Sequence, residues 1–169
     1  MSKPFKLTPV KNGLKEPTSN AIEVKMSQKP TPATDKILWT FGMSGCDAIA
    51  TYNAKTKVRT LTHLPGGNPD ETWFEKMVKY IDQDTVIILV AGGSATGKQH
   101  FEVDQKNYYV NVITNGIKAA GGTPTDMYKT YFRNDVMQPR HNMNGFVFRP
   151  DGRYGLLRQD ATGADDEEP

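Results

Sequence analysis

The sequence predicts a mixed α/β domain built on antiparallel pairs of strands. Short apolar runs rich in β-branched and aromatic residues are bounded by turn residues, a pattern typical of strands. Two longer stretches instead place apolar residues at helical spacing. At 169 residues, the chain suits one domain with a sizeable core.

The first strands are expected at residues 37–41, 47–52 and 58–64. Residues 53–57 form a polar link of hairpin length, so the second and third strands are expected to pair antiparallel. Residues 86–90 are all β-branched or leucine, which predicts a buried strand.

Near the C-terminus we expect a hairpin of residues 145–149 and 153–158. Its turn is Pro150-Asp151-Gly152, whose residue types favour a tight reversal of the chain.

Two helices are expected, one over residues 69–81 and one over residues 105–120. Pro69 suits a first helical turn, and Gly121-Gly122 suits a helix end. Both stretches carry apolar residues at helical spacing: Trp73, Phe74, Met77, Val78 and Ile81 in the first, and Tyr109, Val112, Ile113 and Ile117 in the second.

The chain is expected to have three parts. Residues 1–35 form a basic, proline-containing N-terminal extension with six lysines against three acidic residues, and residues 21–26 within it alternate like an added edge strand. Residues 36–160 form a single domain, and residues 161–169 form an acidic C-terminal tail. We expect the protein to act as a monomer.

The chain has one cysteine, Cys46, which excludes an internal disulfide and a four-thiolate metal site. No apolar run approaches the roughly 18 residues of a membrane-spanning helix, and the N-terminus lacks the apolar core of a secretory signal. We therefore expect a soluble protein, without membrane insertion, that works where thiols stay reduced. Residues 36–159 carry a net charge of +4, which is too small a surplus to argue by itself for nucleic acid as a partner.

Residues 92–98 nearly match the glycine-rich loop that holds nucleotide phosphates. Gln99 replaces the hydroxyl residue that binds Mg²⁺, and no second apolar strand ends in aspartate. We expect a glycine-rich connection here and no cofactor. His100 and His141 have no close-spaced partner, so no metal site is predicted.

Cys46 and His63 form the more specific candidate site. A cysteine becomes a nucleophile when a neighbouring imidazole takes its proton. The midpoint between the two residues falls within the link 53–57, so a hairpin there would bring them side by side. Gly42 and Gly45 allow a tight turn, and we expect this turn to direct backbone N–H groups toward a developing oxyanion. On spacing alone, a buried inert thiol beside a surface histidine remains the simpler alternative.

The segment from Thr40 to Cys46, Thr-Phe-Gly-Met-Ser-Gly-Cys, with His63-Leu64-Pro65 after it, resembles the catalytic segment of CheD, the bacterial chemoreceptor glutamine deamidase. The resemblance continues in order through most of residues 36–160. It includes Gly92-Gly93, Lys106-Asn107, Gly121-Gly122, Gly145-Phe146-Val147-Phe148 and Gly152-Arg153-Tyr154.

The resemblance implies an α/β/β/α sandwich, in which two packed mixed or antiparallel β-sheets are flanked by helices. It also implies an enzyme that converts a glutamine of a partner protein to glutamate without a cofactor. By position, Cys46 would be the nucleophile, His63 the base and then the acid, and Thr40 the residue that orients the imidazole. Ser44 and Gly45 would form the turn beside the oxyanion site, with Ser44 expected to serve the turn rather than the substrate.

Ser44-Gly45-Cys46 departs from the usual CheD order and is similar to the Ser-Gly-Cys motif of the deamidating toxins, cytotoxic necrotizing factor and Burkholderia lethal factor. This favours a toxin or effector, delivered into a host cell by a dedicated secretion system, whose target would be a host GTPase or translation factor. The alternative within the class is a chemoreceptor deamidase in the bacterial cytoplasm.

Two other classes of function remain open. One is a non-catalytic binding module that keeps the same fold. The other, less favoured, is a nucleic-acid-binding protein.

Overall fold

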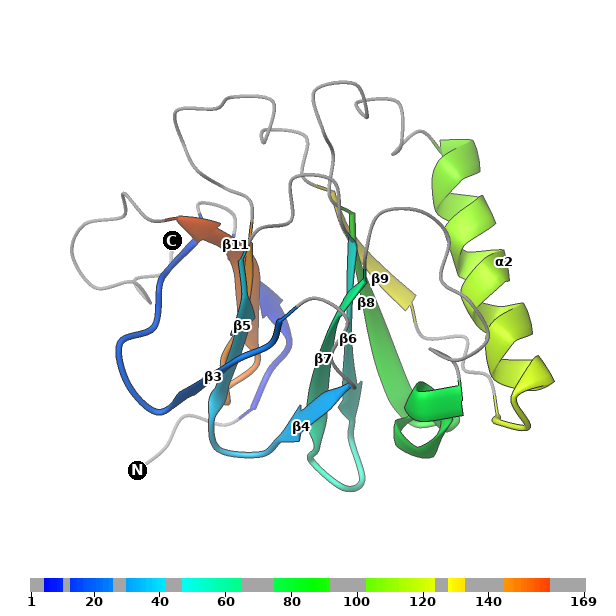
Figure 1. Cartoon of the computed structure of the whole chain (residues 1–169), viewed down its shortest axis with the longest axis horizontal. Coiled ribbons are helices and arrows are strands. Elements are labelled where there is room, and N and C mark those ends of the chain that lie inside the picture. The colour runs from blue at the N-terminus through cyan, green and yellow to red at the C-terminus, as the bar shows by residue number, and fades with distance from the viewer. Residues whose placement is uncertain are drawn as a thin grey trace.

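The computed structural model describes residues 5–10, 13–25, 30–41, 47–64, 75–91, 103–123, 128–132 and 145–158. These residues form a mixed α+β fold with two β-sheets and few helices (Figure 1). The expected α/β class is confirmed at this coarse level.

The first sheet has the strand order β1-β11-β10-β5-β3, and β2 also pairs with β11. Its central strands are β10 and β11, which form the C-terminal hairpin predicted from the sequence, and β5. The bounds are β1 Thr8–Pro9, β2 Leu14–Lys15, β3 Ala21–Glu23, β5 Ile37–Thr40, β10 Phe146–Phe148 and β11 Arg153–Arg158.

The second sheet has the strand order β4-β7-β6-β8-β9. The predicted hairpin of β6 and β7 is confirmed, and its antiparallel register places Ala48 opposite His63. The side-chain oxygen of Asn53 accepts hydrogen bonds from the N–H groups of Lys55 and Thr56, which stabilises the turn. The bounds are β4 Thr31–Ala33, β6 Asp47–Asn53, β7 Arg59–Leu64, β8 Thr85–Ala91 and β9 Tyr128–Phe132.

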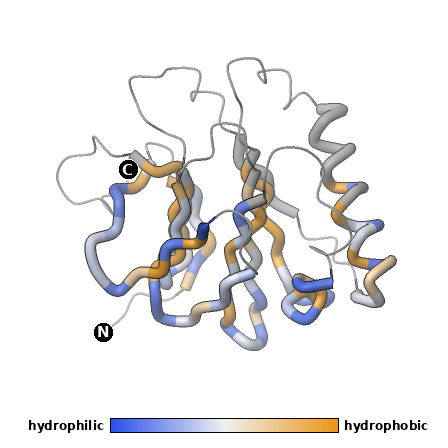
Figure 2. The backbone as a smooth tube through the Cα atoms, viewed as in Figure 1, coloured by the Kyte–Doolittle hydropathy of each residue, from blue (hydrophilic) through white to orange (hydrophobic). Residues whose placement is uncertain are grey.

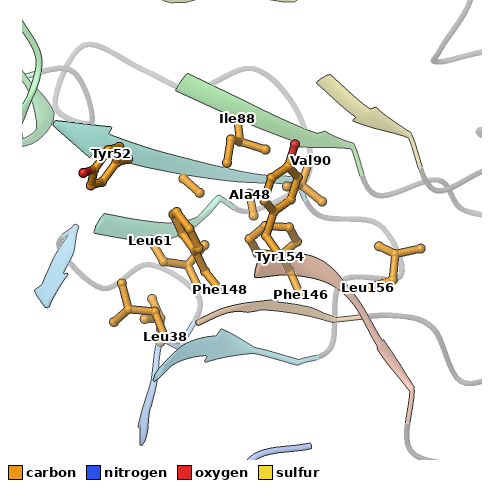
Figure 3. Close-up of a cluster of buried hydrophobic side chains, with 12 residues drawn as sticks. Leu38, Ala48, Tyr52, Leu61, Ile88, Val90, Phe146, Phe148, Tyr154 and Leu156 are labelled. Atoms are coloured by element: carbon orange, nitrogen blue, oxygen red, sulfur yellow. The ribbon is translucent and has the colours of Figure 1, made fainter. Parts of the chain in front are cut away.

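Side chains from both sheets share the largest hydrophobic cluster, which we call the inter-sheet core. Figure 3 shows residues of the two sheets pointing toward one another. Figure 2 shows hydrophobic residues along the central strands, whereas the turns that join them are mostly hydrophilic. The core consists of Val24, Leu38, Ala48, Ala50, Tyr52, Leu61, Ile88, Val90, Phe146, Phe148, Tyr154 and Leu156.

The helix α2, Val103–Ala119, covers the face of the second sheet that lies away from the first (Figure 1). It agrees with the second helix expected from the sequence. Of the first expected helix, residues 75–77 are helical and η1, Val78–Tyr80, follows, while residues 69–74 lie outside the described residues. Both helical segments join one cluster with the second sheet: Ile49, Met77, Ile81, Ile87, Leu89, Ile113 and Ile117.

The outer face of the first sheet is covered differently in the part of the chain that the structure describes. Val10 and Leu14, from the N-terminal segment, pack there against Val147 and Leu157. The helices described here therefore flank only the second sheet.

The N-terminal residues contribute more strands than the single edge strand expected at residues 21–26. β3 falls in that stretch and pairs in parallel with β5, but β1, β2 and β4 also join the sheets. Strands of two or three residues are too short to show an alternating pattern, and the prolines in β1 and β4 argue against strands except at an edge or a strand start. Phe5 also stacks on Tyr52, with ring centroids 3.9 Å apart.

β9 has no counterpart among the strands expected from the sequence. This strand pairs in parallel with β8, and β1 and β3 have parallel partners in the first sheet, so both sheets are mixed rather than purely antiparallel. No helix in the described ranges is long and apolar enough to cross a membrane.

Candidate functional site

His63 lies near the end of β7 in the second sheet, and its side chain is only 2% exposed. The partner residue across the ladder is Ala48, at the start of β6. Cys46 precedes Ala48 by two residues in the sequence. The hairpin therefore places the imidazole beside the strand that begins immediately after the cysteine.

Thr40 is the last residue of β5 in the first sheet and is fully buried. Its hydroxyl oxygen lies 2.6 Å from Nδ1 of His63, within hydrogen-bonding distance. The structure thus brings together two of the three residues that the sequence singled out for catalysis, and it does so across the two sheets.

The Thr40 hydroxyl also contacts a group that the sequence did not suggest. It donates a hydrogen bond of 2.5 Å to the carbonyl oxygen of Val24. The N–H of Val24 donates to the carbonyl oxygen of Trp39 at 2.7 Å, which extends the pairing of β3 with β5 by one residue. A backbone carbonyl carries no signal in sequence, so only the fold could reveal this contact.

Gly145 packs closely against the backbone carbonyl of Thr40. The residue that follows it, Phe146, is the ladder partner of Thr40. A Cβ atom at position 145 would overlap the carbonyl oxygen of Thr40 and would lie 2.9 Å from Leu157 Cδ2. The close approach of the two backbones therefore requires glycine at this position.

Ser44, Gly45 and Cys46 lie outside the described residues, as do residues 92–98, His100 and His141. The described chain reaches Phe41, which is 43% exposed, and resumes at Asp47. The contact of Cys46 with His63, and the turn at Ser44 and Gly45, therefore remain predictions.

Arg59, on β7 four residues before His63, makes a second polar link between the sheets. Its guanidinium donates to the carbonyl oxygen of Phe148 at 2.9 Å and also to that of Lys36. It lies over the Phe148 ring, 5.1 Å from the centroid. Burial lowers the pKa of Arg59 to about 10, although the charges of Asp151 and Asp35 oppose this shift.

A buried imidazole held at one nitrogen by a hydroxyl is suited to acid and base chemistry. The contact at Nδ1 restricts the orientation of the ring. Among the described residues, no three His, Cys, Asp or Glu side chains are grouped as a metal site would require.

No protein-family model matches the chain, and no curated protein matches it significantly.

Proposed function

We propose that the protein is a cysteine-dependent protein-glutamine deamidase. The observation that carries the proposal is the buried hydrogen bond between Thr40 and His63, 2.6 Å long. The resemblance to a deamidase motif predicts that Thr40 orients the imidazole of His63, and no local pattern in the sequence brings these two residues together. Thr40 and His63 are 23 residues apart in the chain and lie in different sheets, so their contact is independent support for the motif.

The proposed reaction divides a difficult hydrolysis into two easier steps. His63 takes the proton of the Cys46 thiol, and the thiolate attacks the carbon of the glutamine amide. N–H groups of the turn at Ser44, Gly45 and Cys46 stabilise the oxyanion. The protonated His63 then donates its proton to the amide nitrogen, and the C–N bond breaks. Ammonia departs, and the acyl group remains on Cys46 as a thioester.

Hydrolysis of the thioester completes the cycle. His63 removes a proton from water, which attacks the thioester carbon, and the Cys46 sulfur leaves and recovers its proton. The products are a glutamate side chain and free enzyme. Thr40 holds the imidazole in the same orientation for both steps, as a positioning residue.

At the finer level of architecture, we propose the α/β/β/α sandwich of this deamidase superfamily. The shared inter-sheet core and the helical layer of α2 on the second sheet support it. The cover of the first sheet by Val10 and Leu14 would then be a feature of this chain.

For the target, we propose a host protein, either a GTPase or a translation factor, reached by a dedicated secretion system. The support is the order Ser44-Gly45-Cys46, which is similar to the toxin motif. A chemoreceptor target is the competing case. Secretion or immunity genes beside the gene favour the first, and chemotaxis genes favour the second.

A capture experiment tests the proposed function. Cys46→Ser is expected to bind the target without turning it over, so the partner that it retains is purified and then treated with the wild-type protein. Peptide mass spectrometry should show one glutamine converted to glutamate by the wild type and unchanged with Cys46→Ser. An unchanged peptide map with both proteins would rule out deamidation of that partner.

Alkylation of Cys46 separates an enzyme from a binding module on the same fold. An ordinary thiol loses about tenfold of its thiolate for each pH unit below a pKa of about 8.5. If His63 holds the thiolate, the rate with iodoacetamide should stay nearly constant down to about pH 6, and His63→Gln should restore the steep decline. Identical steep profiles for both proteins would favour the binding module.

A further inference from the structure

We propose that the backbone carbonyl of Val24 is a positioning group of the site, and that it determines which nitrogen of His63 carries the proton. Val24 belongs to the N-terminal segment, outside the residues that resemble CheD. The assignment of the proton follows from hydrogen bonding alone. Its importance for catalysis rests on the proposed function.

The assignment follows from the number of hydrogens available. A threonine hydroxyl has one hydrogen to donate, whereas a carbonyl oxygen can only accept. The Thr40 oxygen lies 2.5 Å from the Val24 oxygen and 2.6 Å from His63 Nδ1. Two oxygens this close need a hydrogen between them, so the Thr40 hydrogen points to Val24.

Thr40 must then accept a hydrogen from His63. The neutral imidazole therefore carries its proton on Nδ1, and Nε2 carries the lone pair. The opposite arrangement, with Thr40 donating to Nδ1, would leave two oxygens facing each other at 2.5 Å with no hydrogen between them. In a buried site this would cost the full energy of an unmade hydrogen bond.

Val24 is well placed to fix this arrangement because it is held at three points. Its N–H donates to the Trp39 carbonyl, its side chain is buried in the inter-sheet core, and its carbonyl accepts from Thr40. The register of β3 against β5, with Glu23 beside Trp39, places Val24 next to Thr40. The carbonyl is therefore part of a sheet and not of a loose tail.

The same chain of donors suits both states of the imidazole during catalysis. When His63 is protonated, Nδ1 still donates to Thr40, and Thr40 still donates to Val24. The carbonyl dipole then stabilises the cation through the hydroxyl. No group has to turn between the two steps of the reaction.

Ring-nitrogen NMR of the full chain tests the proposal without any substrate. The spectrum contains three histidines, and His63→Gln identifies the signals of His63. At a pH where the imidazole is neutral, we expect a protonated Nδ1 and an unprotonated Nε2. Protonation on Nε2 in the wild type would overturn the proposal, whether or not the protein is a deamidase.

Two variants at Thr40 test the hydroxyl. Thr40→Ser keeps it and should keep the proton on Nδ1, whereas Thr40→Val removes it and should lose that preference. Retention of full Nδ1 protonation in Thr40→Val would show that another group determines the proton position. Thr40→Ser and the wild type remain informative if Thr40→Val folds poorly.

The carbonyl itself is tested by replacing Lys25 with its α-hydroxy analogue, which turns the carbonyl of Val24 into that of an ester, a weaker acceptor. We expect a smaller fraction of Nδ1 protonation and a shift of the Thr40 hydroxyl resonance. Val24→Ala is the control because it shortens the side chain but keeps the amide carbonyl, and it should leave the proton on Nδ1. If the ester variant has the same fraction of Nδ1 protonation as the wild type, the Val24 carbonyl does not determine the proton position.

Discussion

Thr40 and His63 belong to different sheets, and their side chains meet at 2.6 Å. The candidate site therefore exists only when the two sheets are packed together. Hairpin pairing alone orients β7, but it does not supply the hydroxyl that contacts the imidazole. Changes in the inter-sheet core should consequently affect activity as well as stability.

The Thr40 hydroxyl is expected to contribute to rate more than to folding. A hydrogen bond to a charged imidazole contributes about 1.5–3 kcal/mol, so Thr40→Val should lower kcat by about 10- to 100-fold. Thr40→Ser should recover most of that loss. KM should change little, since the hydroxyl does not contact the substrate.

Thr51→Val is the matched control for this variant. Thr51 is also a buried strand threonine, and its hydroxyl bonds to that of Thr60 rather than to a histidine. Its loss should lower the free energy of unfolding but leave kcat unchanged. Equal losses of kcat in the two variants would contradict a positioning role for Thr40.

Gly145→Ala should displace Thr40 and so lower both stability and activity. The new methyl group would overlap the carbonyl oxygen of Thr40, so the end of β5 must shift. We expect a destabilisation of about 1–3 kcal/mol together with a fall in kcat. Urea unfolding and deamidation kinetics on the same preparation measure the two effects.

Gly121→Ala is the control for backbone strain without crowding. Gly121 has φ +84°, and no atom lies within 4 Å of a Cβ placed there. Its replacement should cost about 1 kcal/mol and leave kcat intact. A normal kcat in Gly145→Ala would show that Thr40 tolerates displacement.

Arg59→Lys should destabilise the protein although it conserves the charge. A lysine ammonium cannot reproduce the geometry by which the guanidinium reaches the carbonyls of Phe148 and Lys36. Leaving a buried carbonyl unpaired costs about 1–3 kcal/mol, so the free energy of unfolding should fall by at least that amount. Lys79→Met, which removes an exposed cation that lies over the Tyr80 ring, should lower the free energy of unfolding by no more than about 1 kcal/mol. If Arg59→Lys unfolds in urea at the same midpoint as the wild type, Arg59 does not stabilise the packing of the two sheets.

Asp151 should make the protein sensitive to acid. Burial alone would raise the pKa of Asp151, but hydrogen bonds from the side chain and backbone of Arg153, with the charges of Arg153 and Arg149, lower it below its usual value of 3.8. A carboxyl group whose pKa is lowered by folding stabilises the folded state above its unfolded pKa. That stability is lost as the pH falls through the folded pKa.

Asp151→Asn should therefore be less stable than the wild type at neutral pH, and the difference should shrink as the pH falls below about 4. Urea unfolding at several pH values measures it. A difference that stays constant with pH would mean that the carboxylate charge has no role.

The longer elements could be predicted from the sequence because they have a clear period. The hairpin of β6 and β7, the strand β8 and the helix α2 were expected close to their observed bounds. The short strands β1, β2 and β4 could not be predicted, because two or three residues show no alternation and their pairing depends on distant strands. β9 was missed for a related reason, since a parallel partner brings no turn signal.

The candidate site shows the same limit. Hairpin arithmetic suggested Cys46 and His63, but only the resemblance to deamidases suggested Thr40, because the contact joins two sheets whose packing is not encoded in local pattern. No local sequence pattern indicates the contacts that Val24 and Arg59 make. One acts through its backbone carbonyl, and the other resembles an ordinary surface arginine in sequence.

The most direct test of the central claim is to run the reaction in water labelled with the heavy isotope of oxygen, using the partner captured by Cys46→Ser as the substrate. Hydrolysis of a Cys46 thioester must place one oxygen of the solvent in the new carboxylate, while the amide nitrogen leaves as ammonia. We expect one glutamate carrying a single heavy oxygen with the wild type, and none with Cys46→Ser or His63→Gln. Glutamine left unconverted by the wild type, or label incorporated equally by all three proteins, would contradict the assignment of Cys46 and His63 as the catalytic pair.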